Sequence, residues 1–431
     1  MKKLLVLQGP ASSRSGYGDH TRDILKSLIE MDSFEIKVVD MRWGDCPRNG
    51  IEEKDLYLTK YFARQNISQQ PDIYVQVSVP NEFQPMGKYN IGITAGMETT
   101  AVSAPWIEGV NRMNMVIVPS EHSKKSLLET VYDAVDKRTQ QKTGQLSVQK
   151  PIEVLFEGAD TSVFNTKPVK SDELDEELNS IPESFCFLFV GHWLNGSFGH
   201  DRKDVGGMIS TFCQTFKNNP TRTKPALILK TSSATFSVID EIQMVKQINK
   251  AIKKSGVSNP PNVYLLHGDL SQHEMNYLYN HPKVKAHVSF TKGEGFGRPL
   301  LEASISGKPV IASNWSGQVD FLKHSVKLPG ELKNVHSSAV WKNVILPESK
   351  WFYVNHIYAS RVLNDVFKNY KKYLKESAKQ SRYSLENFSL EAMNIKFKEI
   401  LDKYIVEEVD IKLPKLEKQQ LKLPKLKKAE A

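Results

Sequence analysis

The chain has 431 residues, too many for one compact core, so two domains are expected, and its net charge is +9. Its start holds only the apolar run Leu4–Leu7, shorter than the roughly 7–15 residues of a signal peptide, and no segment approaches the ~18 apolar residues of a membrane span. The three cysteines are odd in number and widely spaced, which excludes a disulfide framework and a zinc site. We therefore expect a cytoplasmic protein.

The first half of the chain alternates short apolar runs with amphipathic segments of helical length. The runs are rich in Val and Ile and are bounded by Gly, Pro, Ser or Asp, which is typical of buried parallel strands. The predicted strands are Leu4–Gln8, Glu35–Val39, Ile73–Val77, Ile91–Thr94, Val116–Pro119 and Ile152–Phe156. His20–Met31 and His122–Tyr132 are predicted helices, and Ser120 is the candidate cap of the second.

The same pattern then restarts after a polar, acidic segment, residues 166–184, which is predicted to be a linker. The second set of predicted strands is Cys186–Gly191, Ala226–Lys230, Asn262–Gly268, Val284–Phe290 and Pro309–Ser313. They alternate with the predicted helices Val205–Phe216, Val238–Lys254, His273–Tyr279 and Leu300–Ser306. After Trp351 the pattern predicts only helices, the last of which ends near Val406.

Two successive strand–helix series predict an α/β protein with two doubly wound, Rossmann-like domains. Ligands of such domains bind beyond the carboxyl ends of the strands. The expected units are residues 1–180, residues 181–380, a helix at 381–410 that packs back on the first domain, and a flexible basic tail at 411–431. The tail holds seven lysines and two glutamates, and IKLPKLEK recurs in it as LKLPKLKK. The tail either increases the solubility of the protein or tethers it to a polyanion.

The stretch EGFGRPLLEASISGKPVIA, residues 294–312, is the most informative motif. Gly295 and Gly297 allow backbone N–H groups to approach a phosphate at the start of a helix, where the helix dipole favours anions. Glu302, one turn into the helix, has two acceptor oxygens that match the vicinal diol of a ribose. Glu294 on the turn can reach hydroxyls at the far end of the same ligand. A diphosphate flanked by two sugars fits this arrangement, as in a nucleotide-sugar.

This stretch resembles the Glu-x7-Glu signature of retaining, family-4-type glycosyltransferases of the GT-B fold, in which two Rossmann-like domains face a cleft. The resemblance extends over most of residues 1–320, including SRSGYGDHTRDILKSL, VIVPSEHSKKSL and LFEGADTSVF, where Glu157 stands in place of the usual asparagine. It implies transfer from a UDP- or GDP-sugar with retention of configuration. The donor would be a co-substrate, with no cofactor.

The resemblance also implies the donor-binding residues. Gly16 and Gly18 match the glycine loop that faces the donor phosphates, and Phe296 lies within the Glu294 turn. Lys203 matches the lysine that grips the diphosphate, but His192 stands where the family has an arginine, and Arg202 is the candidate to compensate.

Lys230, at the end of a predicted strand, is a further candidate for the leaving-group charge, or else a solvated boundary residue. No Asp-x-Asp motif occurs, so we expect no catalytic metal, and lysine, arginine and a helix terminus must stabilise the leaving group.

Glu98 follows a strand of the first domain and is expected to face the cleft, where it either acts as base for the acceptor hydroxyl or satisfies backbone N–H groups. The catalytic candidates are therefore Glu98, Glu294 and Lys203. Asp19 and His20 either contact the acceptor or serve as a cap and a surface residue.

The sequence leaves the acceptor open. GITAGMETTAVSAPWIEGVNRMN and the tail look similar to proteins of large tailed phages, which favours DNA carrying a hydroxymethylated pyrimidine, and host cytoplasm as the location. The alternatives are a lipid-linked or polysaccharide glycan, with peripheral membrane contact, and a non-catalytic module that binds glycan or nucleic acid. A GT-B phosphorylase with pyridoxal phosphate is disfavoured, because nothing resembles the context of its lysine.

Overall fold

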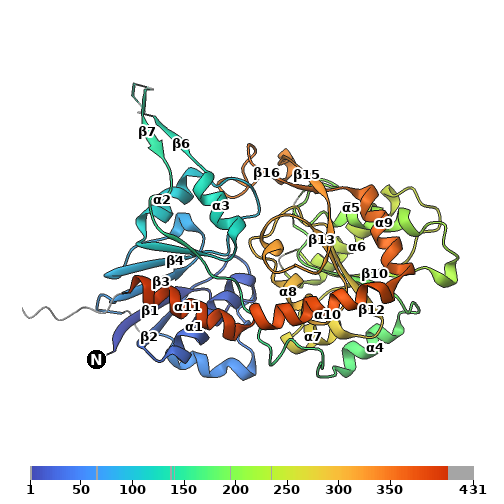
Figure 1. The fold of residues 1–431 in the computed structure, drawn as a ribbon, viewed down its shortest axis with the longest axis horizontal. Helices are drawn as coiled ribbons and strands as arrows, with labels where there is room; N and C mark the ends of the chain where they lie inside the picture. The colour runs from blue at the N-terminus through green and yellow to red at the C-terminus, as the bar shows by residue number, and fades with distance from the viewer. Residues whose placement is uncertain are drawn as a thin grey trace, which may run out of the picture.

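The fold consists of two parallel β-sheets, each covered by helices on both faces (Figure 1). The structure is a computed structural model that describes residues 2–64, 67–135, 138–139, 141–194, 196–233 and 235–405. The predicted basic tail, residues 411–431, lies outside the described residues. Among the described helices, none combines the length and apolarity needed to cross a membrane.

The amino-terminal sheet has six parallel strands in the order β2-β1-β3-β4-β5-β8. The strands are β1 (Lys3–Gly9), β2 (Phe34–Asp40), β3 (Ile73–Val77), β4 (Tyr89–Ile93), β5 (Met115–Val118) and β8 (Ile152–Val154). The central strand β3 is buried along its whole length, as expected for a strand that helices cover on both faces.

The carboxyl-terminal sheet also has six parallel strands, in the order β11-β10-β9-β12-β13-β14. The strands are β9 (Cys186–Val190), β10 (Ala226–Lys230), β11 (Val263–Leu266), β12 (Val284–Ser289), β13 (Val310–Ser313) and β14 (Val326–Leu328). Both sheets therefore have the predicted doubly wound architecture, and the carboxyl ends of β9, β10 and β12 lie side by side.

The helices begin at caps that the sequence supplies. Ser120 accepts a hydrogen bond from the Ser123 N–H at the start of α3, as predicted, and Ser271 and Glu274 form a capping box on α7. The α-helices are α1 (Gly16–Met31), α2 (Ala104–Arg112), α3 (Glu121–Glu129), α4 (Asp172–Ser180), α5 (Val205–Phe216), α6 (Val238–Lys254), α7 (Gln272–Asn280), α8 (Arg298–Ile305), α9 (His356–Lys368), α10 (Tyr370–Asn387) and α11 (Leu390–Tyr404). Short 3₁₀ helices span Glu53–Tyr61, Pro80–Glu82, Thr221–Thr223, Gly317–Asp320 and Ser337–Ala339.

Three predictions about local structure are wrong. The acidic segment predicted as a linker contains the helix α4, which buries Leu174 and Leu178 one turn apart. The chain after Trp351 is not entirely helical, since β16 (Lys350–Val354) pairs antiparallel with β15 (Gly330–Asn334). A further hairpin, β6 (Tyr132–Val135) and β7 (Lys142–Leu146), projects from the amino-terminal domain as an arm, where a helix through Tyr132 was predicted (Figure 1).

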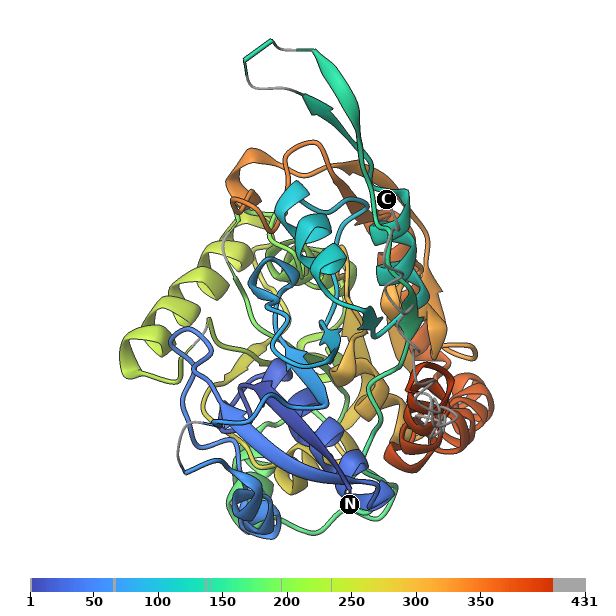
Figure 2. The same ribbon diagram turned by 90° about the vertical axis from the view of Figure 1, so that its left-hand side faces the viewer.

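The last two helices join the domains. α10 packs on α8, where Ser381 Oγ donates a hydrogen bond to the Ile305 carbonyl oxygen at 2.6 Å. α11 then adds four side chains to the core of the amino-terminal domain: Met393, Phe397, Ile400 and Leu401. In Figure 2 these two helices, in red, lie together along one flank of the molecule.

The two domains meet closely at glycines of the carboxyl-terminal domain. A Cβ at Gly293 would lie 1.9 Å from the Glu98 carbonyl oxygen, and one at Gly295 would lie 1.9 Å from the Ala95 carbonyl oxygen. Ser120 Oγ donates to the Gly295 carbonyl oxygen at 2.5 Å. The turn that carries Glu294 is thus pressed against the loop after β4.

We predict that Gly293→Ala lowers the thermal unfolding midpoint, because its methyl group cannot fit against Glu98. Overpacking of this kind costs about 1–3 kcal/mol. Scanning calorimetry is the measurement, and Gly144→Ala is the matched control, because nothing lies within 4 Å of a Cβ at Gly144. Equal midpoints for both variants would contradict the close contact between the domains.

Candidate active site

The predicted site residues lie on loops at the carboxyl ends of neighbouring strands. Arg202 and Lys203 end the loop between β9 and α5, Lys230 ends β10, and Glu294 lies on the turn between β12 and α8. Glu98 comes from the loop after β4 in the other domain. Parallel strands with adjacent carboxyl ends bring these loops together at the cleft between the domains.

Glu294 is buried between two cations. Its carboxylate accepts hydrogen bonds from Lys203 Nζ and from Arg202 Nη1, the latter at 3.1 Å. Burial alone would raise the pKa of Glu294, but the charges of Lys203 and Arg202 outweigh it and lower this pKa to about 2. Glu294 is therefore ionised at neutral pH and serves as an acceptor of hydrogen bonds.

Arg202 extends this ion network across the cleft. Its Nη1 atom also lies 3.6 Å from Glu98 Oε1, and it donates to the Gly293 carbonyl oxygen at 3.2 Å. The network thus brings together all three predicted catalytic residues, Glu98, Lys203 and Glu294. Glu98 keeps 29% of its side chain exposed, which leaves it open to a ligand in the cleft.

Two further predicted residues, Lys230 and His192, lie close to these cations. Lys230 Nζ donates to the Gly268 carbonyl oxygen, and burial lowers the pKa of Lys230 to about 8. The His192 ring lies 3.3 Å from Ser232 Oγ. Loss of surrounding water, together with the charges of Lys203, Arg202 and Lys230, lowers the pKa of His192. Lys203, Arg202 and Lys230 therefore form a group of cations around His192, which stands in place of an arginine and adds no positive charge at neutral pH.

Glu302 belongs to a second cluster, which the sequence did not reveal. Its carboxylate accepts from Tyr279 Oη at 3.1 Å and from Arg298 Nε at 3.2 Å, and Arg298 Nη1 also bonds Asp23 of the other domain at 2.6 Å. Burial raises the pKa of Glu302 to about 7, although Arg298 opposes the shift. Glu157 is also buried here, and its pKa is raised to about 8, first by burial.

The predicted glycines have different surroundings. Gly297 adopts a left-handed φ of 101° directly before α8, where other residues would be strained. Gly16 and Gly18 open α1, and a Cβ at Gly18 would lie 2.1 Å from the Ser13 carbonyl oxygen. Gly295 needs its small size for the domain contact described above. Contact of these backbones with phosphate stays a prediction.

Two side chains named from the sequence are buried in the protein. The Phe296 ring packs against Phe321 in the hydrophobic core, so only its backbone can face a nucleotide. His20 is fully buried, and burial lowers its pKa to about 3, so its assignment as a surface residue is wrong, while contact with an acceptor stays a prediction. Asp19 forms an ion pair with Arg22.

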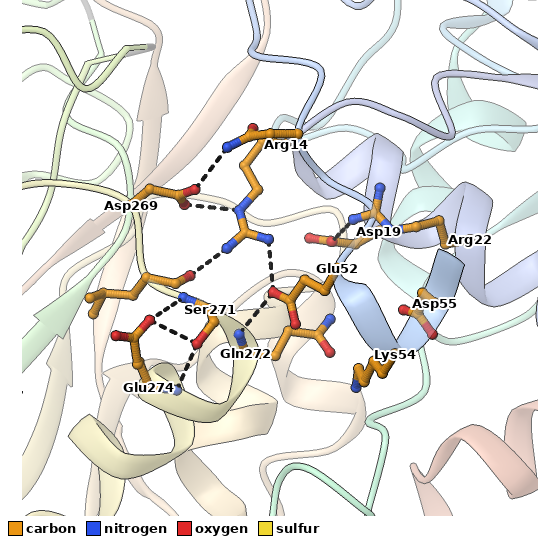
Figure 3. A network of polar contacts seen from close by, with 12 residues as sticks. Arg14, Asp19, Arg22, Glu52, Lys54, Asp55, Asp269, Ser271, Gln272 and Glu274 are labelled. Atoms are coloured by element: carbon orange, nitrogen blue, oxygen red, sulfur yellow. Dashed lines mark hydrogen bonds and ion pairs between the residues drawn. The ribbon is translucent and has the colours of Figure 1, made fainter. Parts of the chain in front are cut away.

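A further contact across the cleft is formed by Arg14, from the loop before α1 (Figure 3). Its guanidinium donates to Asp269 Oδ1 at 2.9 Å and to the Leu270 carbonyl oxygen at 2.6 Å. It also donates to Glu52 Oε1 at 2.9 Å, and Glu52 in turn accepts from the Gln272 N–H at 3.1 Å. The position of Arg14 next to the glycine loop was the one signal in the sequence that it could contact the other domain. Its partners Asp269 and Leu270 lie too far along the chain to be identified from spacing.

Among the described residues, no group of three or more His, Cys, Asp or Glu side chains is arranged to hold a metal ion. The chemistry that the site visibly offers is electrostatic: fixed cations beside an ionised carboxylate. Such an arrangement can neutralise a diphosphate as it gains charge during departure from a sugar.

Residues 222–345 match the family described as "Glycosyl transferases group 1". No curated protein matches the sequence. A glycosyltransferase from Rickettsia africae has a similar structure, with a TM-score of 0.60, 14% identity, and coverage of 94% of this chain and 100% of the other. Sucrose-phosphate synthase from Thermosynechococcus elongatus is also similar, with a TM-score of 0.60 and 13% identity, and the match covers 94% of this chain and 99% of the other. The structure of Anabaena HepE in complex with UDP and glucose has a TM-score of 0.54 and 12% identity, and the match covers 93% of this chain and 100% of the other. The fold is therefore GT-B, as predicted.

We predict that Glu157→Gln raises thermal stability at pH 9 more than at pH 6. Because the folded-state pKa of Glu157 lies near 8, above the ordinary value, its stabilising contribution is present at low pH and is lost as the pH rises through about 8. Glutamine stays neutral, so it avoids this loss, which amounts to about 1.4 kcal/mol per pKa unit. Unfolding midpoints at the two pH values test this, with exposed Glu386→Gln as control. A Glu157→Gln effect independent of pH would contradict the account.

Proposed function

We propose that this chain, a glycosyltransferase by its group 1 segment and its GT-B fold, moves a sugar from a UDP- or GDP-sugar to an acceptor hydroxyl with retention of configuration. The observation that carries the proposal is the ion network of Glu294 with Lys203 and Arg202, on the turn that leads to Glu302. The UDP bound to Anabaena HepE, which shares the fold, supports a uridine nucleotide as the donor carrier.

In this proposal the donor lies along the cleft from Glu302 to Glu294. The Glu302 carboxylate accepts hydrogen bonds from the ribose hydroxyls, and Glu294 accepts them from the sugar. The diphosphate lies among Lys203, Arg202 and Lys230. Lys203 then exchanges part of its contact with Glu294 for a phosphate oxygen, so the cations that balance a buried carboxylate also balance the donor.

Transfer requires the bond from the anomeric carbon to the phosphate oxygen to break. Lys203 and Arg202 stabilise the negative charge that gathers on the departing diphosphate, and Lys230 adds to the positive field. Glu98, whose Oε1 atom lies 3.6 Å from Arg202 Nη1, faces the same cleft. It accepts the proton of the acceptor hydroxyl. Attack from the face that the leaving group vacates accounts for retention without a covalent intermediate.

For the acceptor, we propose a hydroxymethylated pyrimidine in DNA. The support is the charge of the sequence, since seven of its lysines fall within residues 411–431. A lysine-rich segment interrupted by prolines can neutralise phosphates without reading sequence. The enzyme would then act on a hydroxyl that a preceding modification step has introduced into the base.

The first test of the proposal separates the two glutamates. Glu302→Ala is expected to weaken binding of UDP or GDP about tenfold or more, because hydrogen bonds of ~1 kcal/mol each to ribose are lost. Glu294→Ala is expected to reduce turnover and sugar selectivity. Calorimetric titration and initial rates give the two readouts, with Glu386→Ala as control. Negligible effects of both changes would overturn the donor site.

The second test concerns metal dependence. Because Lys203, Arg202 and Lys230 supply the positive charge for the leaving group, sugar transfer is expected to persist in EDTA at the same rate. Rates with and without EDTA, and after addition of magnesium or manganese, provide the measurement. Loss of transfer in EDTA and recovery with metal would contradict the cation account.

The third test addresses DNA binding. Deletion of residues 411–431 is expected to weaken DNA binding at low salt and to flatten its salt dependence, with donor hydrolysis unchanged. A full-length variant with the seven tail lysines changed to glutamine controls for length and should behave like the deletion. Equal affinity and salt slope for all three proteins would refute the tether. Transfer only to glycan or lipid acceptors would refute the DNA proposal.

A further inference from the structure

A large cavity adjoins the ion network of Glu98 and Arg202. Its volume is about 910 Å³, and Glu98 and Arg202 line it at the cleft. Most of the remaining lining comes from three parts of the carboxyl-terminal domain: residues 193, 194 and 196–198 after β9, one face of α6, and residues of the β15–β16 hairpin between 338 and 351. A ligand in the cavity can therefore extend to the atoms that we assign to catalysis.

The walls of the cavity are largely apolar and aromatic. Trp193 and Trp351 line it and are 7% and 0% exposed, and Met244 adds a buried side chain from α6. At its edge Trp341 is 62% exposed and Leu194 is 40% exposed. An exposed tryptophan beside other exposed apolar side chains marks a surface that binds something, because contact with water is unfavourable for it.

The backbone holds Trp341 in a defined position. Its N–H donates to the Ile345 carbonyl oxygen at 3.0 Å, and the Ile345 N–H donates back to the Trp341 carbonyl oxygen at 2.8 Å. This closed turn presents the indole ring from an ordered loop. An indole held in this way loses little conformational freedom when a flat ring stacks on it.

Two of the polar side chains that line the cavity are amides, and three serines and Lys250 add hydroxyls and one ammonium group. Gln243 and Gln247 lie one turn apart on α6 and both line the cavity. Each amide carries donors and acceptors, which can pair with the edge of a heterocycle. Among the described lining residues, the two carboxylates already have partners: Glu98 faces Arg202, and Asp201 Oδ1 accepts from the Val205 N–H at 3.2 Å. A flat heterocyclic ring suits this lining, because it can stack on an indole ring and pair along its edge with the amides.

We propose that this cavity binds the acceptor, and that the acceptor carries its hydroxyl on or beside a flat aromatic ring that stacks on Trp341. The ring edge pairs with Gln243 and Gln247. This inference rests on the proposed function, and it names the substrate class at the same site. A pyrimidine with a hydroxymethyl group has this chemistry, whether as a free nucleotide or turned out of a DNA strand.

The reaction balances with the groups at hand. The acceptor hydroxyl oxygen forms the new bond to the anomeric carbon, while the bond from that carbon to the phosphate oxygen breaks. The electron pair of the broken bond leaves with the nucleoside diphosphate. The hydroxyl proton passes to Glu98, which lies where the cavity meets the cleft.

The test uses the full chain and four acceptors: hydroxymethyl-dCMP, a single-stranded oligonucleotide and a duplex that contain hydroxymethylcytosine, and maltose. Trp341→Ala is expected to raise KM for the hydroxymethylcytosine acceptors about tenfold, because base stacking on an aromatic ring is lost. Trp341→Phe should restore most of the loss. Ile357→Ala, at a residue that is 71% exposed on α9, is the matched control. Donor hydrolysis without an acceptor should be the same in the wild type and in Ile357→Ala.

Binding without the donor gives an independent readout. Hydroxymethyl-dCMP is expected to quench the tryptophan fluorescence of the wild type, and Trp341→Phe should lose most of this quenching. Comparison of the free nucleotide with the two DNA acceptors shows which form of the base is the substrate. Transfer to hydroxymethyl-dCMP indicates a nucleotide precursor of DNA, and transfer only to the oligonucleotide or duplex indicates a base within a strand. Either result supports the aromatic acceptor.

Two results would overturn the inference, and the first of them would refute the proposed DNA acceptor as well. One is donor hydrolysis with no transfer to any hydroxymethylcytosine acceptor, or with transfer to maltose instead. The other is the same acceptor KM for Trp341→Ala and Ile357→Ala. If the wild type neither binds nor hydrolyses UDP- and GDP-sugars, the proposed function itself fails. The two failures are therefore distinguishable.

Discussion

The burial of Glu294 between Lys203 and Arg202 is the constraint on which the rest of the site depends. A buried carboxylate requires paired charges, since an unpaired charge in the interior would cost several kcal/mol. The two cations come from the loop after β9, and the carboxylate comes from the turn after β12, the neighbouring strand. The parallel sheet therefore sets the position of the charges. Arg202 then links them to Glu98, and Gly293 allows the Glu98 loop to approach.

The same principle operates at two further contacts across the cleft. Arg298 pairs with Asp23, and Arg14 pairs with Asp269 and Glu52. In every case an arginine joins the two domains through a carboxylate, and each arginine lies next to a group that we assign to the donor. A nucleotide-sugar carries two negative phosphates and several hydroxyls, so it can exchange partners with these pairs as it binds. In the proposed function, the domain contact and the donor site thus share one set of charges.

The sequence was sufficient for those features that repeat along the chain. Runs of Val and Ile identified eleven of the twelve strands of the two large sheets, because buried parallel strands need continuous apolar segments. β14 and the two antiparallel hairpins were missed, since Gly330–Asn334 and Lys142–Leu146 are polar and largely exposed. α4 was missed because its acidic residues outweighed Leu174 and Leu178, whose spacing of four was the available signal.

The same division applies to the site. Lys203, Glu294 and Glu302 were predicted because they stand in a recognisable motif, and Arg202 because it precedes Lys203. Arg298 lies inside the motif, yet its partner Asp23 is 275 positions away, and no local pattern reports such a pair. Trp341 belongs to a loop without a recognisable motif. Only the three-dimensional structure shows that it lines the same cavity as Glu98 and Arg202.

The most direct measurement of the central claim compares the affinities of UDP and GDP with those of uridine and guanosine in the wild type and in Lys203→Met. If Lys203 holds the diphosphate, one of the diphosphates binds at least about tenfold more tightly than its nucleoside, because a hydrogen bond to a charged group contributes about 1.5–3 kcal/mol. Lys203→Met should then remove most of this difference and leave nucleoside binding unchanged. If the diphosphate and the nucleoside keep the same ratio of affinities in the variant, Lys203 does not hold the phosphates and the account is wrong.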